Sequence, residues 1–322
     1  MITAIITAFN EPTTITKALK YIVNPDFSGF RKNLQVIQIS PDEETLEKAS
    51  KYISTIKNPK LEYLQIKDEQ LGKPHALNVG LKRAKSDIVV LTDGDVHFTE
   101  SSFVNLIEEF KKRKLDVACG KVISKNSTKT LTGYISHLMT SAAHHKRLIE
   151  LSGKTEGYGT KLVHKTNFFP LSGYMLIFNK KKLEQVLGEG FVFPTDCLVE
   201  DAYLSYVAYN YGLKLGYIPQ ARVYAKFPSN LSDYFKQKKR STGGYLQLWK
   251  YGVIKKETNA RSFWQELRYF WYPFKFAKSL RDIIYSLIYF PIRLYLWLMM
   301  WWERKILKKD FIKTWVRIES TK

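Results

Sequence analysis

Cysteine is scarce in this 322-residue chain, which has only Cys119 and Cys197. Two isolated cysteines indicate neither a disulfide framework nor a cysteine-based metal site, and they fit a reducing, cytosolic environment. Internal repeats and long low-complexity tracts are absent, so a repeat architecture is not expected. The chain opens on β-branched residues without a basic-then-apolar leader, and we therefore expect no signal peptide.

Acidic residues are few relative to basic ones, and the formal net charge is +21. Residues 1–225 hold 30 Lys+Arg against 23 Asp+Glu, whereas residues 226–322 hold 21 against 7. Aromatic residues make up 14% of the chain. A basic, aromatic-rich C-terminal part suits an anionic membrane surface, a nucleic acid or a polyphosphate-bearing substrate.

Short apolar runs alternate with amphipathic stretches through the first part of the chain. The expected strands are residues 2–8, 34–39, 61–66, 88–92 and 115–124, and the expected helices are residues 13–22, 41–56 and 101–114. This alternation favours βαβ units and a parallel sheet. The predicted fold class is α/β, with a mostly parallel sheet flanked by helices.

Asp93-Gly94-Asp95 follows the apolar run at residues 88–91 and Thr92. Open α/β sheets bind ligands beyond the carboxyl ends of their strands. Two carboxylates there repel each other unless a cation lies between them, and oxygen ligands suit Mg²⁺ or Mn²⁺ bridging to a phosphate. The alternative is an ordinary turn.

Several motifs occur in a fixed order along the chain. They are residues 7–11 (Thr-Ala-Phe-Asn-Glu), Asp42, Gly72-Lys73 with Ala76-Leu77-Asn78 and Gly80, Asp93-Gly94-Asp95, Ser172-Gly173, Glu200-Asp201, and Gln237 with Arg240. Together they resemble the family 2 glycosyltransferases, which have a nucleotide-sugar-binding fold of the GT-A type. The family's commoner acidic-Gly-Ser pattern is altered at Asp42.

The resemblance implies a donor site for a nucleotide-diphosphate sugar, with uridine favoured as the nucleoside. Its residues would be Thr7, Ala8, Asn10, Glu11, Asp42, Lys73, Asn78, Asp93 and Gly94, and Asp93 with Asp95 would hold Mn²⁺ or Mg²⁺. Lys73 could instead be a solvated loop lysine, and Asn78 a local cap. Asn10 and Glu11 could be helix-entry residues only.

The resemblance also implies an acceptor side. Asp201 would be the general base, because inversion at the anomeric carbon needs a carboxylate that takes the proton of the attacking hydroxyl. Ser172, Gly173, Glu200, Gln237 and Arg240 would contact the acceptor or the diphosphate. Without the other motifs, Glu200 and Asp201 would merely complement a helix dipole. Ser241 replaces the tryptophan of the Gln-x-x-Arg-Trp signature, which puts polymer elongation in doubt, and residues 242–246 could form a gating loop.

Residues 283–302 contain a single charge, Arg293, and Pro291 near the middle. About 20 apolar residues can cross a bilayer, but Pro291 suggests two shorter helices or a kink, and a central arginine is costly there. We expect amphipathic helices at the membrane interface, in preference to a crossing or to burial in the core or in a dimer. The expected domains are residues 1–225 (catalytic), 226–262 (basic segment and gating loop) and 263–322 (membrane-interface helices).

The sequence therefore predicts a metal-dependent, inverting glycosyltransferase at the cytoplasmic face of the membrane, with a lipid-linked or polysaccharide acceptor and no nucleic-acid partner. Within the same enzyme class, a polyprenyl-phosphate sugar synthase is the competing hypothesis. Outside it, the competing hypotheses are a nucleotidyltransferase, a basic nucleic-acid-binding protein and an inactive membrane scaffold. The sugar, the acceptor and the oligomeric state stay open.

Overall fold

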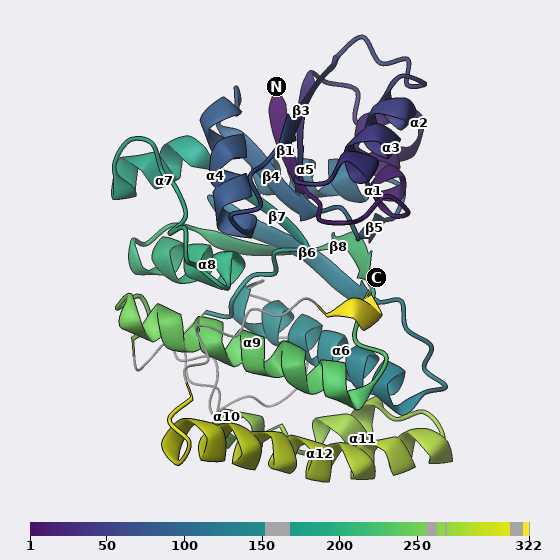
Figure 1. Cartoon of the computed structure of the whole chain (residues 1–322), viewed down its shortest axis with the longest axis vertical. Coiled ribbons are helices and arrows are strands. Elements are labelled where there is room, and N and C mark those ends of the chain that lie inside the picture. The colour runs from purple at the N-terminus through teal and green to yellow at the C-terminus, as the bar shows by residue number, and fades with distance from the viewer. Residues whose placement is uncertain (152–167, 256–262, 268, 310–317, 322) are drawn as a thin grey trace. The chain divides into compact units, whose positions relative to one another are not determined.

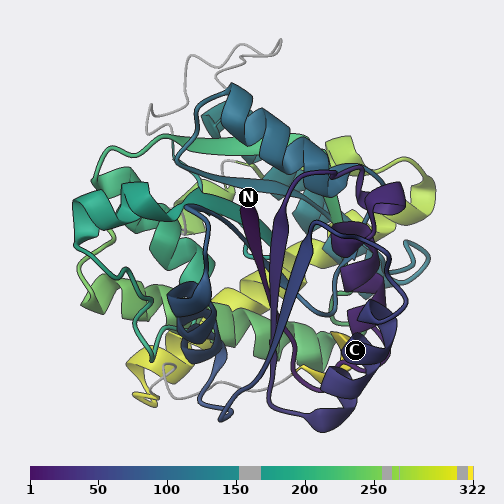
Figure 2. The same cartoon turned by 90° about the horizontal axis from the view of Figure 1, so that it is seen from above.

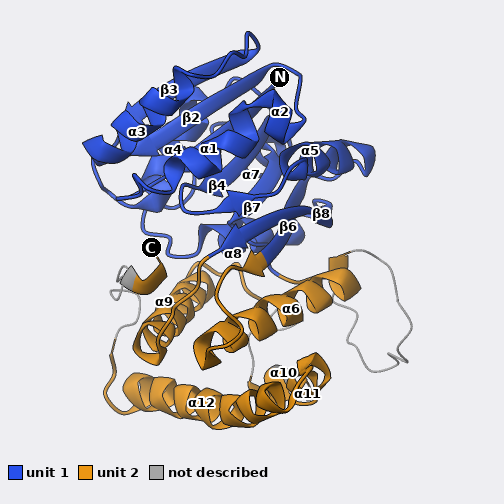
Figure 3. Cartoon of the chain, turned by 90° about the vertical axis from the view of Figure 1, so that its right-hand side faces the viewer, with its two compact units in different colours: residues 1–122, 170–225 blue, residues 123–169, 226–322 orange. Residues whose placement is uncertain are grey.

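The computed structural model describes residues 1–151, 168–255, 263–267, 269–309 and 318–321. The chain divides into two compact units, each built from two separate stretches of sequence (Figure 3). Unit 1 comprises residues 1–122 and 170–225, and unit 2 comprises residues 123–169 and 226–322. The predicted catalytic range 1–225 differs from this division, because residues 123–169 belong to unit 2.

Unit 1 contains strands and helices in alternation (Figure 1). In chain order they are β1 (Ile2–Thr7), α1 (Ile15–Val23), α2 (Pro25–Ser28), β2 (Leu34–Ser40), α3 (Glu43–Ile53), β3 (Leu61–Lys67), α4 (Lys73–Arg83), β4 (Ile88–Asp93), β5 (His97–Phe98), α5 (Ser102–Lys112), β6 (Val117–Ser124), β7 (Met175–Asn179), α7 (Lys180–Leu187), α8 (Glu200–Asn210) and β8 (Leu215–Ala225). The strand-forming runs that the sequence predicted are all present.

The eight strands form one sheet in the order β3-β2-β1-β4-β7-β6-β8-β5. Strands β3, β2, β1 and β4 run parallel, whereas β7 is antiparallel to both β4 and β6, and β5 is antiparallel to β8. The sheet is therefore mixed, and the expectation of a mostly parallel sheet holds only for its first half. Alternation of strands and helices predicts the order of elements but not the direction of each strand.

Helices cover both faces of the parallel half (Figures 1 and 2). Helices α1 and α3 lie on one face, and α4 lies on the other. Strands β1 and β2 are buried along their whole length, as expected for strands covered on two sides. The carboxyl ends of β1 and β4 are neighbours, since Thr7 pairs with Asp93. The two predicted donor motifs therefore meet at one edge of the sheet.

In its described residues, unit 2 contains helices and the last two residues of β6. Its elements are α6 (Leu131–Leu151), α9 (Leu231–Lys250), α10 (Phe263–Leu267), α11 (Tyr272–Phe276), α12 (Leu280–Lys305) and the short 3₁₀ helix η3 (Glu319–Thr321). A cluster of buried side chains from α6, α9 and α12 forms its core, consisting of Ile135, Tyr234, Leu296 and Met300. Two predictions in this unit are wrong.

The first wrong prediction is the gating loop at residues 242–246, which lies inside α9. Gly243 and Gly244 are buried on this helix, so packing outweighs the low helix propensity of glycine. The second is the division into two shorter helices at Pro291, which lies inside the continuous helix α12, whereas the alternative of a kink there stays a prediction. Ser279 caps α12 by accepting a hydrogen bond from Asp282 N at 3.2 Å. The helix continues through Pro291 although proline cannot donate a backbone hydrogen bond.

Candidate active site

The turn at residues 93–95 is fastened to the end of β1. Gly94 N donates to Thr7 O at 2.9 Å, and Thr7 Oγ1 donates to Asp93 Oδ1 at 3.4 Å. A Cβ atom on Gly94 would lie only 2.6 Å from Ala8 Cβ and 2.6 Å from Glu11 Oε2. Glycine is therefore required for this close approach. The predicted donor residues Thr7, Ala8, Glu11, Asp93 and Gly94 are brought together in the structure.

Asp42 organises the loop after β1. Its Oδ2 accepts hydrogen bonds from Asn10 N and Ser40 Oγ at 2.8 Å each, and its Oδ1 caps α3 by accepting from Thr45 N at 2.9 Å. Burial acts to raise the pKa of Asp42, but the hydrogen bonds outweigh it and lower that pKa. Asn10 has φ = 53°, in the left-handed region that asparagine tolerates. Contacts of these two residues with a nucleoside stay a prediction.

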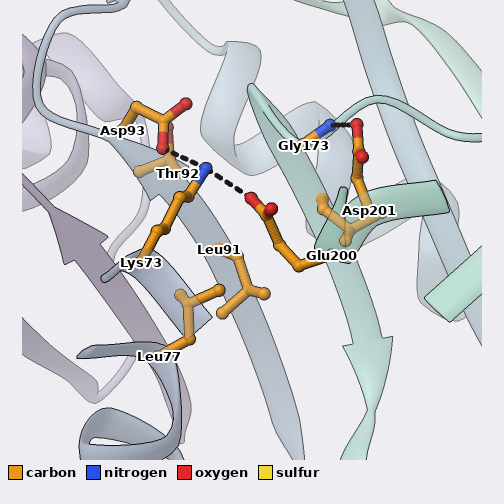
Figure 4. A pocket seen from close by; sticks show the side chains of 9 residues that line it. Lys73, Leu77, Leu91, Thr92, Asp93, Gly173, Glu200 and Asp201 are labelled. Carbon is orange, nitrogen blue, oxygen red and sulfur yellow. Dashed lines mark hydrogen bonds and ion pairs between the residues drawn. The ribbon is translucent and has the colours of Figure 1, made fainter. Parts of the chain in front are cut away.

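Lys73 connects the two acidic motifs. It is the first residue of α4, and its Nζ lies 2.6 Å from Asp93 Oδ1 and 2.6 Å from Glu200 Oε1 (Figure 4). Burial acts to lower the pKa of Lys73, but the two carboxylates outweigh it and raise that pKa well above its usual value. The predicted alternative of a solvated loop lysine is therefore wrong.

Asp201 lies in the first turn of α8 and is held by two backbone groups. Gly173 N donates to its Oδ2 at 2.8 Å, and Ala202 N donates to its Oδ1 at 2.7 Å. Burial raises the pKa of Asp201 and neighbouring Glu200 raises it further, whereas the bond from Gly173 opposes the shift. A carboxylate with a raised pKa is a stronger base, which suits proton abstraction.

One pocket joins these groups. It is lined by Lys73, Leu77, Leu91, Thr92, Asp93, Gly173, Leu176, Glu200 and Asp201. The sequence analysis did not predict the apolar residues of this pocket, although the spacing of two leucines from predicted site residues could have indicated them. Leu77 lies one turn beyond Lys73 on α4, and Leu91 lies two residues before Asp93 on the same face of β4. Predicted Ser172 is buried beside Gly173 but does not line the pocket.

The side-chain amide of Asn78 is engaged by the backbone of Phe193. Its Nδ2 donates to Phe193 O at 2.8 Å, its Oδ1 accepts from Phe193 N at 2.7 Å, and the side chain is buried. Both ends of the amide thus hold the backbone of the segment that leads into α8, and we correct its predicted role to a structural one. Gln237 and Arg240 lie on α9 in unit 2. Their contacts with diphosphate or acceptor stay predictions.

Asp93 and Asp95 present the oxygen ligands that hard divalent cations prefer. Burial raises the pKa of Asp93, Lys73 opposes the shift, and the charge of Asp95 adds to it. The two carboxylates are thus close enough to repel each other, and a cation would relieve that repulsion. Among the described residues, no group of three or more His, Cys, Asp or Glu side chains could hold a metal. The residues fit a cation that takes its remaining ligands from a substrate.

The mixed sheet and the two acidic motifs that meet in one pocket can now be compared with known proteins. The family model described as glycosyl transferase family group 2 matches residues 88–303. The chain belongs to this family and is a glycosyltransferase with a GT-A-like fold. The family supports the enzyme class over a nucleic-acid-binding protein.

Curated relatives include poly-beta-1,6-N-acetyl-D-glucosamine synthases. The protein from Staphylococcus epidermidis is 23% identical over 83% of this chain and 57% of its own length, and that from Staphylococcus aureus (strain COL) is 25% identical over 76% and 54%. The chain thus spans just over half the length of the curated relatives it matches.

Two solved structures share the fold. The mannosyltransferase PcManGT from Pyrobaculum calidifontis, in complex with GDP-Man and Mn²⁺, has a TM-score of 0.55 and 18% identity over 97% of this chain and 85% of its own. S. aureus TarS 1–349, in complex with UDP-GlcNAc, has a TM-score of 0.50 and 14% identity over 86% and 80%. At these identities the likeness establishes the fold.

Proposed function

We propose that this enzyme transfers a sugar, with inversion, from a nucleotide-diphosphate sugar to a hydroxyl group of a polysaccharide or lipid-linked acceptor. The observation that carries the proposal is the pocket in which Lys73 bridges Asp93 and Glu200 beside Asp201. The residues that we propose for leaving-group stabilisation and for proton removal line this one pocket. A UDP-sugar is the favoured donor, because TarS binds UDP-GlcNAc and the curated relatives make an N-acetylglucosamine polymer.

In the proposed reaction Asp201 takes the proton of the acceptor hydroxyl while its oxygen forms a bond to the anomeric carbon. The bond from that carbon to the diphosphate breaks, and the nucleoside diphosphate leaves with the electron pair. Each oxygen of Asp201 accepts one backbone hydrogen bond and keeps a further lone pair for the proton. The raised pKa of Asp201 favours this step.

Negative charge grows on the diphosphate as it leaves. Asp93 and Asp95 would hold Mn²⁺ or Mg²⁺, which supplies Lewis-acid stabilisation of that charge when bound. Lys73 would add a second positive charge, because its ammonium already lies between Asp93 and Glu200. Glu200 pairs with that ammonium, and we assign to Glu200 the role of orienting Lys73.

We further propose that α12 lies in the membrane interface. By length and composition it could cross a membrane, and only 17% of its most apolar window is buried. Ser286, Leu296 and Met300 face the core of unit 2, and Arg293 forms an ion pair with Glu266 there. The opposite side exposes large apolar residues, namely Leu280, Ile284, Leu287, Leu294, Leu298 and Trp301. One side packed on protein and the other apolar is the pattern of a helix lying in the interface plane.

The reaction is tested with a donor panel and one substitution. Thermal unfolding with UDP-GlcNAc and GDP-mannose, each with and without Mn²⁺, identifies the donor, because a ligand that binds the folded state raises its apparent stability. Asp201→Asn should keep this stabilisation and abolish release of the nucleoside diphosphate. Asp196→Asn, on an exposed residue shortly before α8, is the control and should keep full activity. Near wild-type turnover by Asp201→Asn would disprove the base assignment.

The membrane arrangement is tested by labelling. Cys119 and Cys197 are both buried, so single cysteines introduced at Ser279 and Lys309 would dominate labelling by a membrane-impermeant maleimide on sealed vesicles. An interfacial α12 exposes both positions on one side, whereas a crossing helix exposes them on opposite sides. Loss of vesicle binding on Leu287→Glu plus Leu294→Glu would support the apolar side as the contact. Unchanged binding would argue against it.

A further inference from the structure

Ser205 contributes a second connection between α8 and the segment that precedes β7. It is fully buried one helical turn beyond Asp201. Its Oγ accepts a hydrogen bond from Leu171 N at 3.0 Å and donates one to Asp201 O at 2.6 Å. The proposed proton transfer and leaving-group stabilisation do not use this hydroxyl. Its two partners belong to the two segments that hold the base.

The two connections match in spacing. Residues four apart on a helix are separated by about 6.0 Å along its axis, and residues two apart on an extended chain by about 6.6 Å. Leu171 N and Gly173 N are two residues apart, and their acceptors Ser205 Oγ and Asp201 Oδ2 are four residues apart. Two alternate N–H groups of this segment thus each donate to a side chain of α8, and the two side chains are one helical turn apart.

This pairing controls where the carboxylate of Asp201 points. Gly173 N fixes one oxygen of Asp201, but it can do so only if residues 171–173 keep their register against α8. A Cβ atom on Gly173 would lie 3.2 Å from Asp201 Cβ, so the two segments approach closely. Thr92 Oγ1 donates to Tyr174 O at 2.8 Å and ties the same segment to the end of β4. Ser205 completes the attachment on the α8 side.

We infer that Ser205 is a positioning residue for catalysis, holding residues 171–173 in the register that orients the Asp201 carboxylate for proton removal. This inference rests on the proposed role of Asp201 as the base. Ser205 itself touches no reacting atom. Its removal should slow the chemical step and leave donor binding intact, because the donor groups at Asp93 and Lys73 do not contact it.

The test compares Ser205→Ala with Ser102→Ala. Ser102 is equally buried in unit 1, and its Oγ also accepts from a backbone N–H, that of Arg222 at 3.2 Å, yet it lies on α5 away from the pocket. The assay is release of nucleoside diphosphate from UDP-GlcNAc or GDP-mannose with Mn²⁺. Ser205→Ala should lower kcat about 10- to 100-fold with donor KM nearly unchanged, as expected for a slightly misplaced base. Ser102→Ala should leave kcat unchanged.

The pH profile supplies a readout that lost stability alone would not move. The bond from Gly173 favours the charged form of Asp201, so loosening it raises the pKa of Asp201 further. The acidic limb of the kcat profile should therefore move to higher pH in Ser205→Ala and stay in place in Ser102→Ala. Wild-type kcat and an unmoved limb in Ser205→Ala would overturn the inference.

Two further variants keep the test decisive if Ser205→Ala does not fold. Ser205→Thr retains the hydroxyl, and Ser205→Cys retains the shape with a weaker hydrogen-bonding group. The expected order of kcat is serine, then threonine, then cysteine, and a cysteine variant equal to wild type would overturn the inference. Asp201→Asn distinguishes failure of the positioning role of Ser205 from failure of the base assignment of Asp201. If that variant is inactive while Ser205→Ala is fully active, only the positioning role fails; if Asp201→Asn stays active, the base assignment fails first.

Discussion

Lys73→Met removes the ammonium that pairs with both Asp93 and Glu200, and it tests how much these ion pairs stabilise the fold. The substitution keeps an unbranched side chain but leaves Asp93 and Glu200 facing each other without the ammonium that lies 2.6 Å from each. Breaking a fully buried ion pair costs about 3–5 kcal/mol, because a charge stays behind without a partner. The side chains of Lys73 and Asp93 are 34% and 22% exposed, and water screens part of that loss. We expect a loss of about 2–3 kcal/mol in the free energy of unfolding at pH 7.5.

Lys85→Met is the matched control. Lys85 Nζ lies at the same 2.6 Å from Glu62 Oε1, but these side chains are 58% and 42% exposed. Exposed ion pairs contribute about 0.2–1 kcal/mol, so this variant should lose little. Since the substitution and the distance are equal, the difference between the two variants measures burial together with the second ion pair, which Lys73 forms with Glu200. Urea unfolding of both variants and the wild type gives the comparison directly.

The pH dependence follows from the signs of the shifts. The pKa of Lys73 is raised, so its stabilising contribution is present at neutral pH and is lost only as the pH rises through that raised value. The pKa of Asp93 is also raised, so as the pH falls Asp93 becomes neutral at a higher pH than an ordinary aspartate does. The destabilisation of Lys73→Met should therefore shrink between pH 7.5 and about pH 4. An equal loss at both pH values, or a loss no larger than that of Lys85→Met, would refute the reasoning.

Three further predictions concern other parts of the molecule. Gly94→Ala should cost about 1–3 kcal/mol and weaken donor binding, because its Cβ would meet Ala8 and Glu11; thermal unfolding and donor titration check it. The turnover of the wild type should fall on the acidic side at a pH above 4, the usual range of an aspartate, because burial and Glu200 raise the pKa of Asp201; a pH–rate profile locates the limb. Arg293→Met should lower the free energy of unfolding by about 1–3 kcal/mol at pH 7 and by less at pH 4. The reason is that Arg293 lowers the pKa of Glu266, and a carboxyl group with a lowered pKa stabilises the fold only above its unfolded pKa. Arg281→Met, on an exposed ion pair, should cost less, and urea unfolding at both pH values checks both variants.

Local signals were enough to predict the strands and the acidic motifs. Strands β1, β2 and β4 are continuous apolar, β-branched runs, and such runs are buried on both faces in a parallel sheet. The motif at residues 93–95 was placed correctly at a strand end, because the turn residues follow the apolar run directly. These predictions depend only on residues that are close together in the sequence.

Predictions that depend on distant partners were less successful. The Asn78 amide binds the backbone of Phe193, and nothing in the sequence around either residue indicates that the two are in contact. Ser205 likewise reads as an ordinary helix serine until Leu171 is brought beside it. The antiparallel direction of β7 depends on the path of the chain through unit 2, which periodicity does not encode. Burial of Gly243 and Gly244 similarly depends on packing within unit 2.

The division of the chain has a consequence for how it can be cut. The sequence suggested residues 1–225 as an independent domain, but α6 lies within that range and belongs to unit 2. Tyr134, Ile135 and Leu138 on α6 are buried, and in unit 2 Tyr134 Oη pairs with Ser286 Oγ on α12 at 2.8 Å. A polypeptide that stops at residue 225 would keep α6 but lose α12, exposing this apolar side to water and inviting aggregation. A fragment that keeps unit 1 whole would instead join residue 122 to residue 170 through a linker and end at residue 225.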